Sequence, residues 1–333
     1  MFIHERKKKE ERRKKRDERM SVFEHSISGV LVILVMIVLG YILAERGWFG
    51  EKSTKLIARL VTQIALPCYM VSTIVTRFNA DDLPRMLPDL RFPIISMVIL
   101  MAFAFAIVKI FRIRKSHAGL FSSMFFNSNT VFVGLPINRA LFGADSIPYV
   151  LIYYMANTTI FWTLGTYLIQ RDGGLKSQLD WKKALGKIFS PPLMGFIVGV
   201  IFVLLKVQLP VFVKSDLDYI GNLTIPLSML FIGISVSHAG LNHLALHKDN
   251  ILVLMGRFLF APALMFLLVM PADMPVLMKQ VFILQSAMPV MTNAPVVASL
   301  YGADSDYAAV MVTETTLISL AVVPILMLVT QSI

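Results

Sequence analysis

Apolar runs of about 20 residues recur along this 333-residue chain, separated by short polar links. A helix of about this length crosses a hydrocarbon core of roughly 30 Å. Lipid-exposed backbone must satisfy its own hydrogen bonds, and no run shows the period-two pattern of a barrel strand. We therefore predict an all-α polytopic membrane protein with ten transmembrane helices. The predicted spans are 26–44, 57–76, 92–111, 118–142, 147–169, 191–208, 216–237, 250–270, 276–301 and 306–330.

A short phrase of the sequence occurs twice, 159 positions apart. It reads LFGADS at Leu141–Ser146 and LYGADS at Leu300–Ser305. The same offset places Pro136 on Pro295, Pro67 on Pro226 and Gly40 on Gly199. Because these matches fall at equivalent points of the spans, we predict two homologous halves of five spans. An odd number of spans per half forces the second half to insert upside down, which is the inverted-repeat architecture of many secondary transporters.

The predicted halves occupy residues 26–170 and 191–333, joined by a cytoplasmic link at 171–190. A basic tail, residues 1–25, precedes them. Ten of the 32 basic residues lie among the first 19, where they alternate with acidic residues and lack aromatic interleaving. This pattern predicts a disordered tail rather than a nucleic-acid arm, so no nucleic-acid partner is expected. Alternatively, translation begins at Met20.

The basic residues in the links close to the spans predict the orientation of the chain. If the N-terminus lies outside, the inner links hold 15 Lys and Arg residues and the outer links hold 7. The ten basic residues of the head indicate the opposite orientation. The bias of the inner links is spread over four separate segments, so we predict that both termini lie outside.

Two spans contain prolines that discourage continuous helix, Pro136 in the fourth span and Pro295 in the ninth. Polar residues nearby could pair with the freed backbone groups. Half-helices that meet at depth aim their positive N-terminal ends inward, which predicts an anionic substrate. We expect Asn129 and Asn293 to face each other across the site. The candidate substrate-binding residues are Asn127, Asn129, Thr130, Pro136, Pro289, Thr292, Asn293 and Pro295. For an isolated Asn or Thr, hydrogen bonding between helices is the alternative role.

Glu314 lies about eight residues into the last span, where an ionised carboxylate costs on the order of 3 kcal/mol. We predict that it carries a coupling proton or helps to hold a sodium ion, with Arg257 as a conceivable counter-charge. The alternative is a glutamate that reaches an interface or hydrogen-bonds to a helix. Asp145 and Asp304 end their spans and are predicted to follow a helix stop and cap the next helix.

Metal and redox chemistry find little support in the sequence. The single cysteine, Cys68, excludes an intramolecular disulfide and a thiolate metal site. His243 and His247 have a spacing found in metal sites, but no carboxylate motif accompanies them, so we expect a solvated loop and no metal.

Three motifs together resemble the auxin efflux carrier family, which includes plant PIN-type carriers and bacterial malate and malonate permeases. They are NTxxxGLP at Asn129–Pro136, MLFIGIS at Met229–Ser235 and AMPxxxNA at Ala287–Ala294, the last followed by Tyr301-Gly302. The resemblance covers residues 26–330. It implies a fold like that of the bile acid sodium symporters, with crossing broken helices four and nine.

The resemblance also implies organic carboxylate substrates, malate- or malonate-like or auxin-like, and an alternating-access, elevator-like cycle. By matching, Asn129, Pro136, Pro289 and Asn293 fall on the crossover. The chain departs from the family pattern in its basic head and in Glu314, where an apolar or small residue is expected. It also has a short link between the fifth and sixth spans, where plant carriers have a long hydrophilic loop. The departures indicate a short prokaryotic type in a bacterial inner membrane. A homodimer through scaffold helices is also an expectation.

Two rival functions remain at this point. A sodium- or proton-coupled cation transporter of the same fold would need paired carboxylates at mid-membrane, and only Glu314 qualifies. A transporter-like membrane sensor would carry an appended signalling domain, which the sequence lacks. No nucleophile with a base, no metal pair and no Walker loop occurs at depth, so we expect neither an enzyme nor a cofactor. Coupling to sodium or protons stays open.

Overall fold

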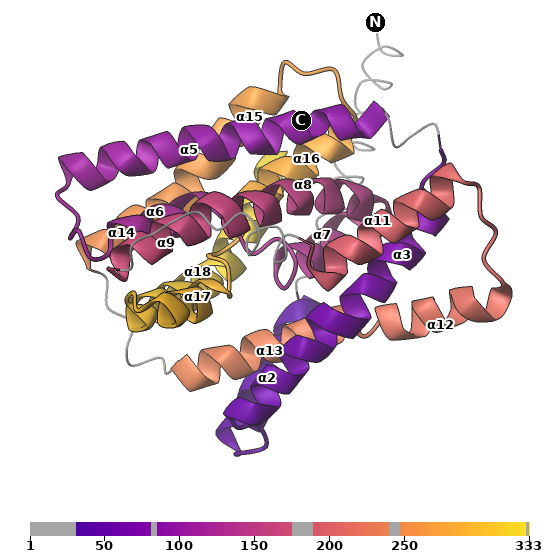
Figure 1. The fold of residues 1–333 in the computed structure, drawn as a ribbon, viewed down its shortest axis with the longest axis horizontal. Helices are drawn as coiled ribbons and strands as arrows, with labels where there is room; N and C mark the ends of the chain where they lie inside the picture. The colour runs from indigo at the N-terminus through magenta and orange to yellow at the C-terminus, as the bar shows by residue number, and fades with distance from the viewer. Residues whose placement is uncertain (1–30, 81–84, 175–188, 240–246, 331–332) are drawn as a thin grey trace, which may run out of the picture.

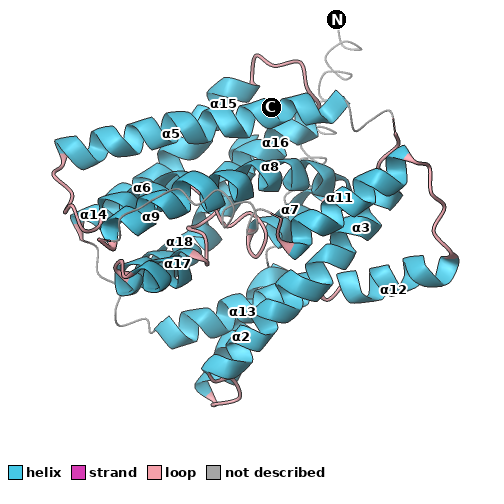
Figure 2. Ribbon diagram, in the orientation of Figure 1, coloured by secondary structure: helices cyan, strands magenta, loops and turns pink. Residues whose placement is uncertain are grey.

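The computed structural model describes residues 31–80, 85–174, 189–239, 247–330 and 333. Every regular element within these ranges is a helix, as Figure 2 shows, and this confirms the all-α prediction. The basic tail at 1–25, most of the link at 171–190 and His243 lie outside the described residues.

The first half of the chain begins with a helix over Leu31–Glu45. The elements that follow are α2 Glu51–Leu60, the π-turn Val61–Ala65, α3 Leu66–Arg77, the 3₁₀ turn Leu87–Leu90, α5 Arg91–Ile110, α6 Ala118–Phe126, α7 Gly134–Phe142, the 3₁₀ turn Ala144–Ser146, α8 Ile147–Ile160, the π-turn Phe161–Gly165 and α9 Thr166–Asp172. Figure 1 shows α5 along one edge of the molecule and α2 at the opposite edge.

The second half begins at α11. Its elements are α11 Pro191–Leu204, α12 Val211–Gly221, α13 Thr224–Ala239, α14 Lys248–Met255, the π-turn Gly256–Phe260, α15 Ala261–Val269, α16 Val276–Ser286, α17 Ala294–Tyr301 and α18 Ser305–Thr330. Helix α14 packs against α6, and α17 packs against both α6 and α9, whereas α12 lies on the far side of α3 (Figure 1).

Five helical stretches are long and apolar enough to cross a membrane. They are Lys52–Arg77, Leu87–Ile110, Val211–His238, Lys248–Val269 and Ser305–Met327, and three shorter apolar helices accompany them. The surfaces of the long stretches and of the shorter helices carry exposed aliphatic and aromatic side chains, such as Val35, Phe103 and Leu267. Such side chains face lipid at little cost, so the described helices form a multi-pass membrane protein.

Two glycines related by the 159-residue offset make the same kind of contact. A Cβ atom on Gly199 of α11 would lie 2.8 Å from Cβ of Ile74 in α3. A Cβ atom on Gly40 would lie 2.5 Å from the carbonyl oxygen of Leu230 in α13. Glycine therefore lets the first helix approach α13 and lets α11 approach α3, as small residues do at helix interfaces in membranes.

The largest cluster of buried apolar side chains among the described residues includes some helices and leaves out others. A large cluster joins α5, α6, α8, α9 and α14 to α18, with Phe121, Phe125 and Phe282 near its middle. Helices α11 and α12 pack instead against α3, and a separate cluster that includes Met70 and Phe196 joins α3 and α11 to α8. We call the first set of helices, together with α7, which packs against α8 and α16, the core body. The set of α2, α3, α11, α12 and α13 is called the flanking body.

The repeated LFGADS and LYGADS phrases both end a helix at a glycine. Gly143 follows α7 with φ of 74°, and Gly302 follows α17 with φ of 75°. The backbone N–H of Tyr307 donates to Oδ1 of Asp304 at 2.9 Å, so Asp304 caps α18 as predicted. Asp145 differs, because its carboxylate pairs with Arg77 at 2.7 Å and accepts no cap hydrogen bond from α8.

Candidate functional site

The fourth and ninth predicted spans are each interrupted. Helix α6 ends at Phe126 and α7 begins at Gly134, while α16 ends at Ser286 and α17 begins at Ala294. Pro136 and Pro295 lie in the first turns of α7 and α17, where the missing N–H costs no helical hydrogen bond. The prolines therefore begin the second half-helices, and the interruptions precede them.

The two interruptions contact each other directly. The backbone N–H of Asn129, in the first interruption, donates to the carbonyl oxygen of Pro289 in the second at 2.8 Å. The side chain of Gln285 adds a second link, because its Nε2 donates to the carbonyl oxygen of Thr130 at 3.2 Å. Non-helical backbone in an apolar environment is tolerated only where such partners exist.

Neighbouring helices supply further partners to the non-helical backbone. Asn157 of α8 pairs with Ser128 through both amide atoms, accepting from its N–H at 2.9 Å and donating to its carbonyl at 2.8 Å. Thr315 of α18 accepts from the N–H of Val290 at 3.0 Å. Each interruption is therefore fixed by a polar side chain of a helix that packs beside it.

Arg257 binds the ends of both helices that precede the interruptions. Its Nη1 donates to the carbonyl oxygen of Phe125 in α6 at 3.1 Å. Its Nη2 donates to Ser286 in α16, and Nε and Nη2 both donate to Met288 at 3.1 Å. Only 1% of Arg257 is exposed. The guanidinium thus compensates the negative C-terminal ends of two helices at once.

A cavity of about 220 Å³ lies beside the two interruptions. We call it the central cavity. Its polar lining consists of Thr62, Gln63, Asn129, Thr130, Tyr154, Thr158, Trp162, Ser190, Thr292 and Asn293. None of the described residues that line it carries a formal charge. Ser190 and Asn293 are the N-cap residues of α11 and α17, so two helices direct their N-terminal ends toward the cavity.

The side chain of Asn129 has a defined orientation. Its Oδ1 accepts a hydrogen bond from the N–H of Phe132 at 3.1 Å, which identifies the other amide atom as the nitrogen. That nitrogen, Nδ2, is buried and donates to no residue that the structure describes. An unpaired buried donor costs about 1–3 kcal/mol, so it is a group ready to bind a ligand acceptor.

The structure brings together four of the predicted substrate-binding residues at the central cavity. Asn129 and Thr130 come from the first interruption, and Thr292 and Asn293 come from the second. The other four do not line it: Asn127, Pro136, Pro289 and Pro295. Asn127 instead donates to the carbonyl oxygen of Ser123 at 3.3 Å, one turn back in α6.

Several lining residues are not among the predicted substrate-binding residues. Thr62 and Gln63 lie in the π-turn before α3, where Pro67 signals a distorted helix. Tyr154, Thr158 and Trp162 recur every four residues along the fifth predicted span, so one helical face carries all three. This spacing is the signal that could have identified them. The role of Arg257 had no such signal.

Glu314 does not line the central cavity. It is buried, with 3% of its surface exposed, and its Oε2 accepts from Nδ2 of Asn250 in α14 at 2.9 Å. Arg257, the expected counter-charge, donates to backbone carbonyls as described above. Among the described residues, Arg257 and Glu314 are the only buried ones that carry a formal charge.

Gly134 controls how closely α16 approaches the first interruption. A Cβ atom at this position would lie 2.2 Å from Oε1 of Gln285, which is fully buried. Gly134→Ala is therefore expected to displace Gln285 from Thr130 and to destabilise the fold by about 1–3 kcal/mol in thermal unfolding. Adding Gln285→Ala should restore part of this loss, and equal stability of Gly134→Ala and the wild type would contradict the contact.

Comparison with known proteins agrees with this architecture. Residues 25–327 match the family described as membrane transport protein. An uncharacterised transporter of Methanothermobacter thermautotrophicus is 28% identical over 309 residues, which cover 91% of this chain and 98% of the relative. An uncharacterised transporter of Methanocaldococcus jannaschii is 26% identical over 301 residues, or 88% and 95% of the two chains. The chain therefore belongs to the membrane transport protein family, the auxin efflux carrier family that its motifs predict.

Proposed function

We propose that this membrane transporter carries small organic carboxylate anions by alternating access, with the central cavity as the substrate site. The observation that carries the proposal is the set of hydrogen-bond donors and positive groups at the central cavity and the two interruptions. The cavity is lined by uncharged donors and by two helix N-termini. The buried guanidinium of Arg257 donates to the carbonyl oxygen of Met288, the residue before Pro289, whose own carbonyl joins the two interruptions. Each of these features stabilises negative charge.

The same pattern disfavours a cation as the substrate. A cation site in a membrane is built from carboxylates or from carbonyl oxygens free to coordinate. No carboxylate among the described residues lines the central cavity. The carbonyls of Phe125, Ser286 and Met288 are engaged by Arg257. An anion therefore meets donors at this site, whereas a cation would meet no carboxylate among the described lining residues.

The size of the cavity supports a small substrate. Its volume of about 220 Å³ lies below the range of roughly 300–1,000 Å³ found for sites of drug-sized ligands. Amide and hydroxyl groups suit the oxygens of a carboxylate, and Trp162, Phe132 and Leu66 can contact its carbon atoms. These features fit short mono- or dicarboxylates such as malonate better than long-chain acids.

We further propose ten transmembrane helices in two inverted halves, with the interrupted helices crossing at the site. The paired glycine contacts of Gly40 and Gly199 and the matching turns at Gly143 and Gly302 support the repeat. The grouping of the helices into a core body and a flanking body supports an elevator-like cycle, in which the core body carries the interruptions and the bound substrate past the flanking body. In this scheme both termini lie outside.

The substrate class can be tested through Trp162, which lines the central cavity. A variant with Trp48→Phe and Trp181→Phe retains Trp162 as the only tryptophan of the chain. Malonate is expected to change its fluorescence saturably, whereas malonamide, which has the same shape without charge, is expected to have little effect. An equal response to both compounds, or none to any short carboxylate, would contradict an anion site.

Glu314 is proposed to couple transport to protons. It is buried beside Asn250 in the core body and does not line the central cavity, so it would act on transport without direct contact with the substrate. Glu314→Gln is expected to make the uptake rate in proteoliposomes independent of an imposed pH gradient. Glu45→Gln, at an exposed helix end, is the matched control. A Glu314→Gln carrier that keeps the wild-type pH response would remove the coupling role.

A further inference from the structure

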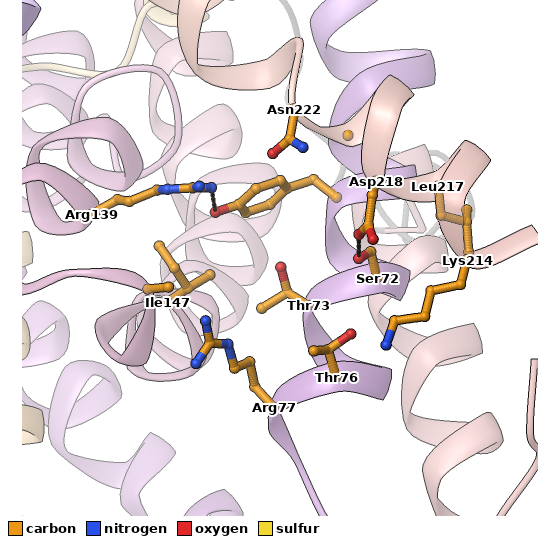
Figure 3. A pocket seen from close by; sticks show the side chains of 13 residues that line it. Ser72, Thr73, Thr76, Arg77, Arg139, Ile147, Lys214, Leu217, Asp218 and Asn222 are labelled. Carbon is orange, nitrogen blue, oxygen red and sulfur yellow. Dashed lines mark hydrogen bonds between the residues drawn. The ribbon is translucent and has the colours of Figure 1, made fainter. Parts of the chain in front are cut away.

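A second cavity, of about 260 Å³, lies between α3, α7 and α12, and we call it the cationic pocket. Three basic side chains line it, one from each helix: Arg77, Arg139 and Lys214. Figure 3 shows Arg77 and Arg139 on one side of the pocket and Lys214 on the other. One carboxylate, Asp218, also lines the pocket, and it accepts a hydrogen bond from Ser72. Positive charge therefore exceeds negative charge on the walls.

Much of the donor capacity of these side chains is unused. Arg139 donates from Nη1 to the hydroxyl of Tyr69 at 2.9 Å, which engages one of its five N–H groups. Arg77 pairs through Nη1 with Asp145 at 2.7 Å. Lys214 makes no ion pair with any residue that the structure describes. A guanidinium and an ammonium that face one cavity form a site for a carboxylate or phosphate oxygen.

The pocket also lies where the two bodies meet. Arg139 is on α7, the half-helix that begins at the first interruption, whereas Tyr69 and Arg77 are on α3 of the flanking body. The contacts Arg139–Tyr69 and Arg77–Asp145 therefore link the core body to the flanking body. An anion bound here would compete for the donors of both contacts. All three basic residues belong to links that the predicted topology places outside.

We infer that the cationic pocket is a second binding site for a small organic carboxylate, separate from the central cavity. The anion binds where the two bodies meet. When it is bound, Arg139 donates to the anion instead of to the hydroxyl of Tyr69. The ligand class rests on the proposed function, while the presence of an anion site rests on the pocket itself. A cleft whose walls carry an excess of one sign of charge raises the local concentration of the opposite ion, by about tenfold or more.

Charged thiol reagents can test this site by position. Cys68→Ser removes the only native thiol, and Leu217→Cys places a new one on the pocket wall. The control is Val211→Cys, on the same helix α12, at a residue that is 83% exposed and does not line the pocket. Asn222→Cys, in the loop after α12, is a second reporter if Leu217→Cys does not fold.

The expected result concerns two rates of labelling. At each position, the labelling rate of an anionic methanethiosulfonate is divided by that of a cationic one. This ratio should be about tenfold higher at position 217 than at position 211. Adding Arg139→Gln and Lys214→Gln should remove this preference. Malonate should slow labelling at 217 and leave labelling at 211 unchanged. Equal preference at both positions, or no protection by malonate, would overturn the inference.

Two parallel measurements distinguish this inference from the proposed function and from a lipid headgroup as the ligand. The Trp162 response reports the central cavity, so protection that fails at 217 while Trp162 responds would refute the second site and leave the proposed function intact. Labelling in nanodiscs with and without phosphatidylglycerol tests a lipid headgroup as the ligand. Protection by that lipid, with none from malonate, would overturn the assignment to a soluble carboxylate.

Discussion

Asn129→Asp is expected to abolish anion binding at the central cavity while leaving the fold intact. The substitution keeps the oxygen that accepts from the N–H of Phe132, so the interruption retains its local hydrogen bond. It removes the unpaired Nδ2 donor and adds a negative charge. Like charges placed together cost several kcal/mol, which corresponds to a loss of affinity of about 100-fold or more. Trp162 fluorescence measures that affinity for malonate.

Asn293→Asp is also expected to weaken anion binding at the central cavity, and it tests this effect at a second residue. Asn293 is the N-cap of α17, where aspartate is favoured and interacts well with the helix dipole, so stability should not fall. It still adds a negative charge to the cavity wall. Asn79→Asp, at an exposed residue that follows α3, is the control and should bind malonate as the wild type does. Tighter anion binding by either cavity variant would contradict the assigned sign of the site.

Arg257→Met is expected to cause the largest loss of stability among single substitutions at the site. Methionine matches the apolar stem of arginine but leaves the carbonyls of Phe125, Ser286 and Met288 without their donor. Each unpaired buried carbonyl costs about 1–3 kcal/mol, so the total reaches about 3 kcal/mol or more. Thermal unfolding of the purified protein in detergent should show a lower midpoint, and transport should be lost.

Arg257→Lys separates charge from hydrogen-bond geometry. Lysine keeps the positive charge, but its ammonium cannot span carbonyls of two helices as a planar guanidinium does. The lysine variant should therefore fold better than Arg257→Met and still bind malonate more weakly than the wild type. Arg59→Met, on the exposed face of α2, controls for the loss of an arginine. If Arg257→Met unfolds at the wild-type temperature, the guanidinium does not hold the two helices together.

The fold was largely predictable because a bilayer restricts what each segment can do. Apolar runs of sufficient length must be helical, and the repeat of LFGADS and LYGADS identified two equivalent helix ends, which the glycines at positive φ now occupy. The positions of the interruptions were also accessible, because Pro136 and Pro295 begin the half-helices that follow them. The residues of each segment, without its tertiary contacts, were enough to predict the helices, their ends and the interruptions.

The site was only half predictable because its remaining members depend on packing between distant segments. Asn127 and Asn129 are two positions apart, yet one hydrogen-bonds within α6 and the other lines the cavity. Nothing in the local sequence distinguishes them. The partners of Arg257 lie in α6 and α16, which are far from it in the chain, so its role required the tertiary structure. The cationic pocket likewise combines residues of three separate helices.

Counterflow in proteoliposomes tests most directly whether this carrier moves organic anions through the central cavity. Vesicles loaded with unlabelled malonate, malate or another short carboxylate are diluted into the labelled compound, with and without sodium. Wild-type vesicles should accumulate at least one labelled carboxylate, and Asn129→Asp vesicles should accumulate none. If no carboxylate exchanges, and labelled sodium exchanges instead and does so faster in Asn129→Asp, the site binds cations and the proposed function is wrong.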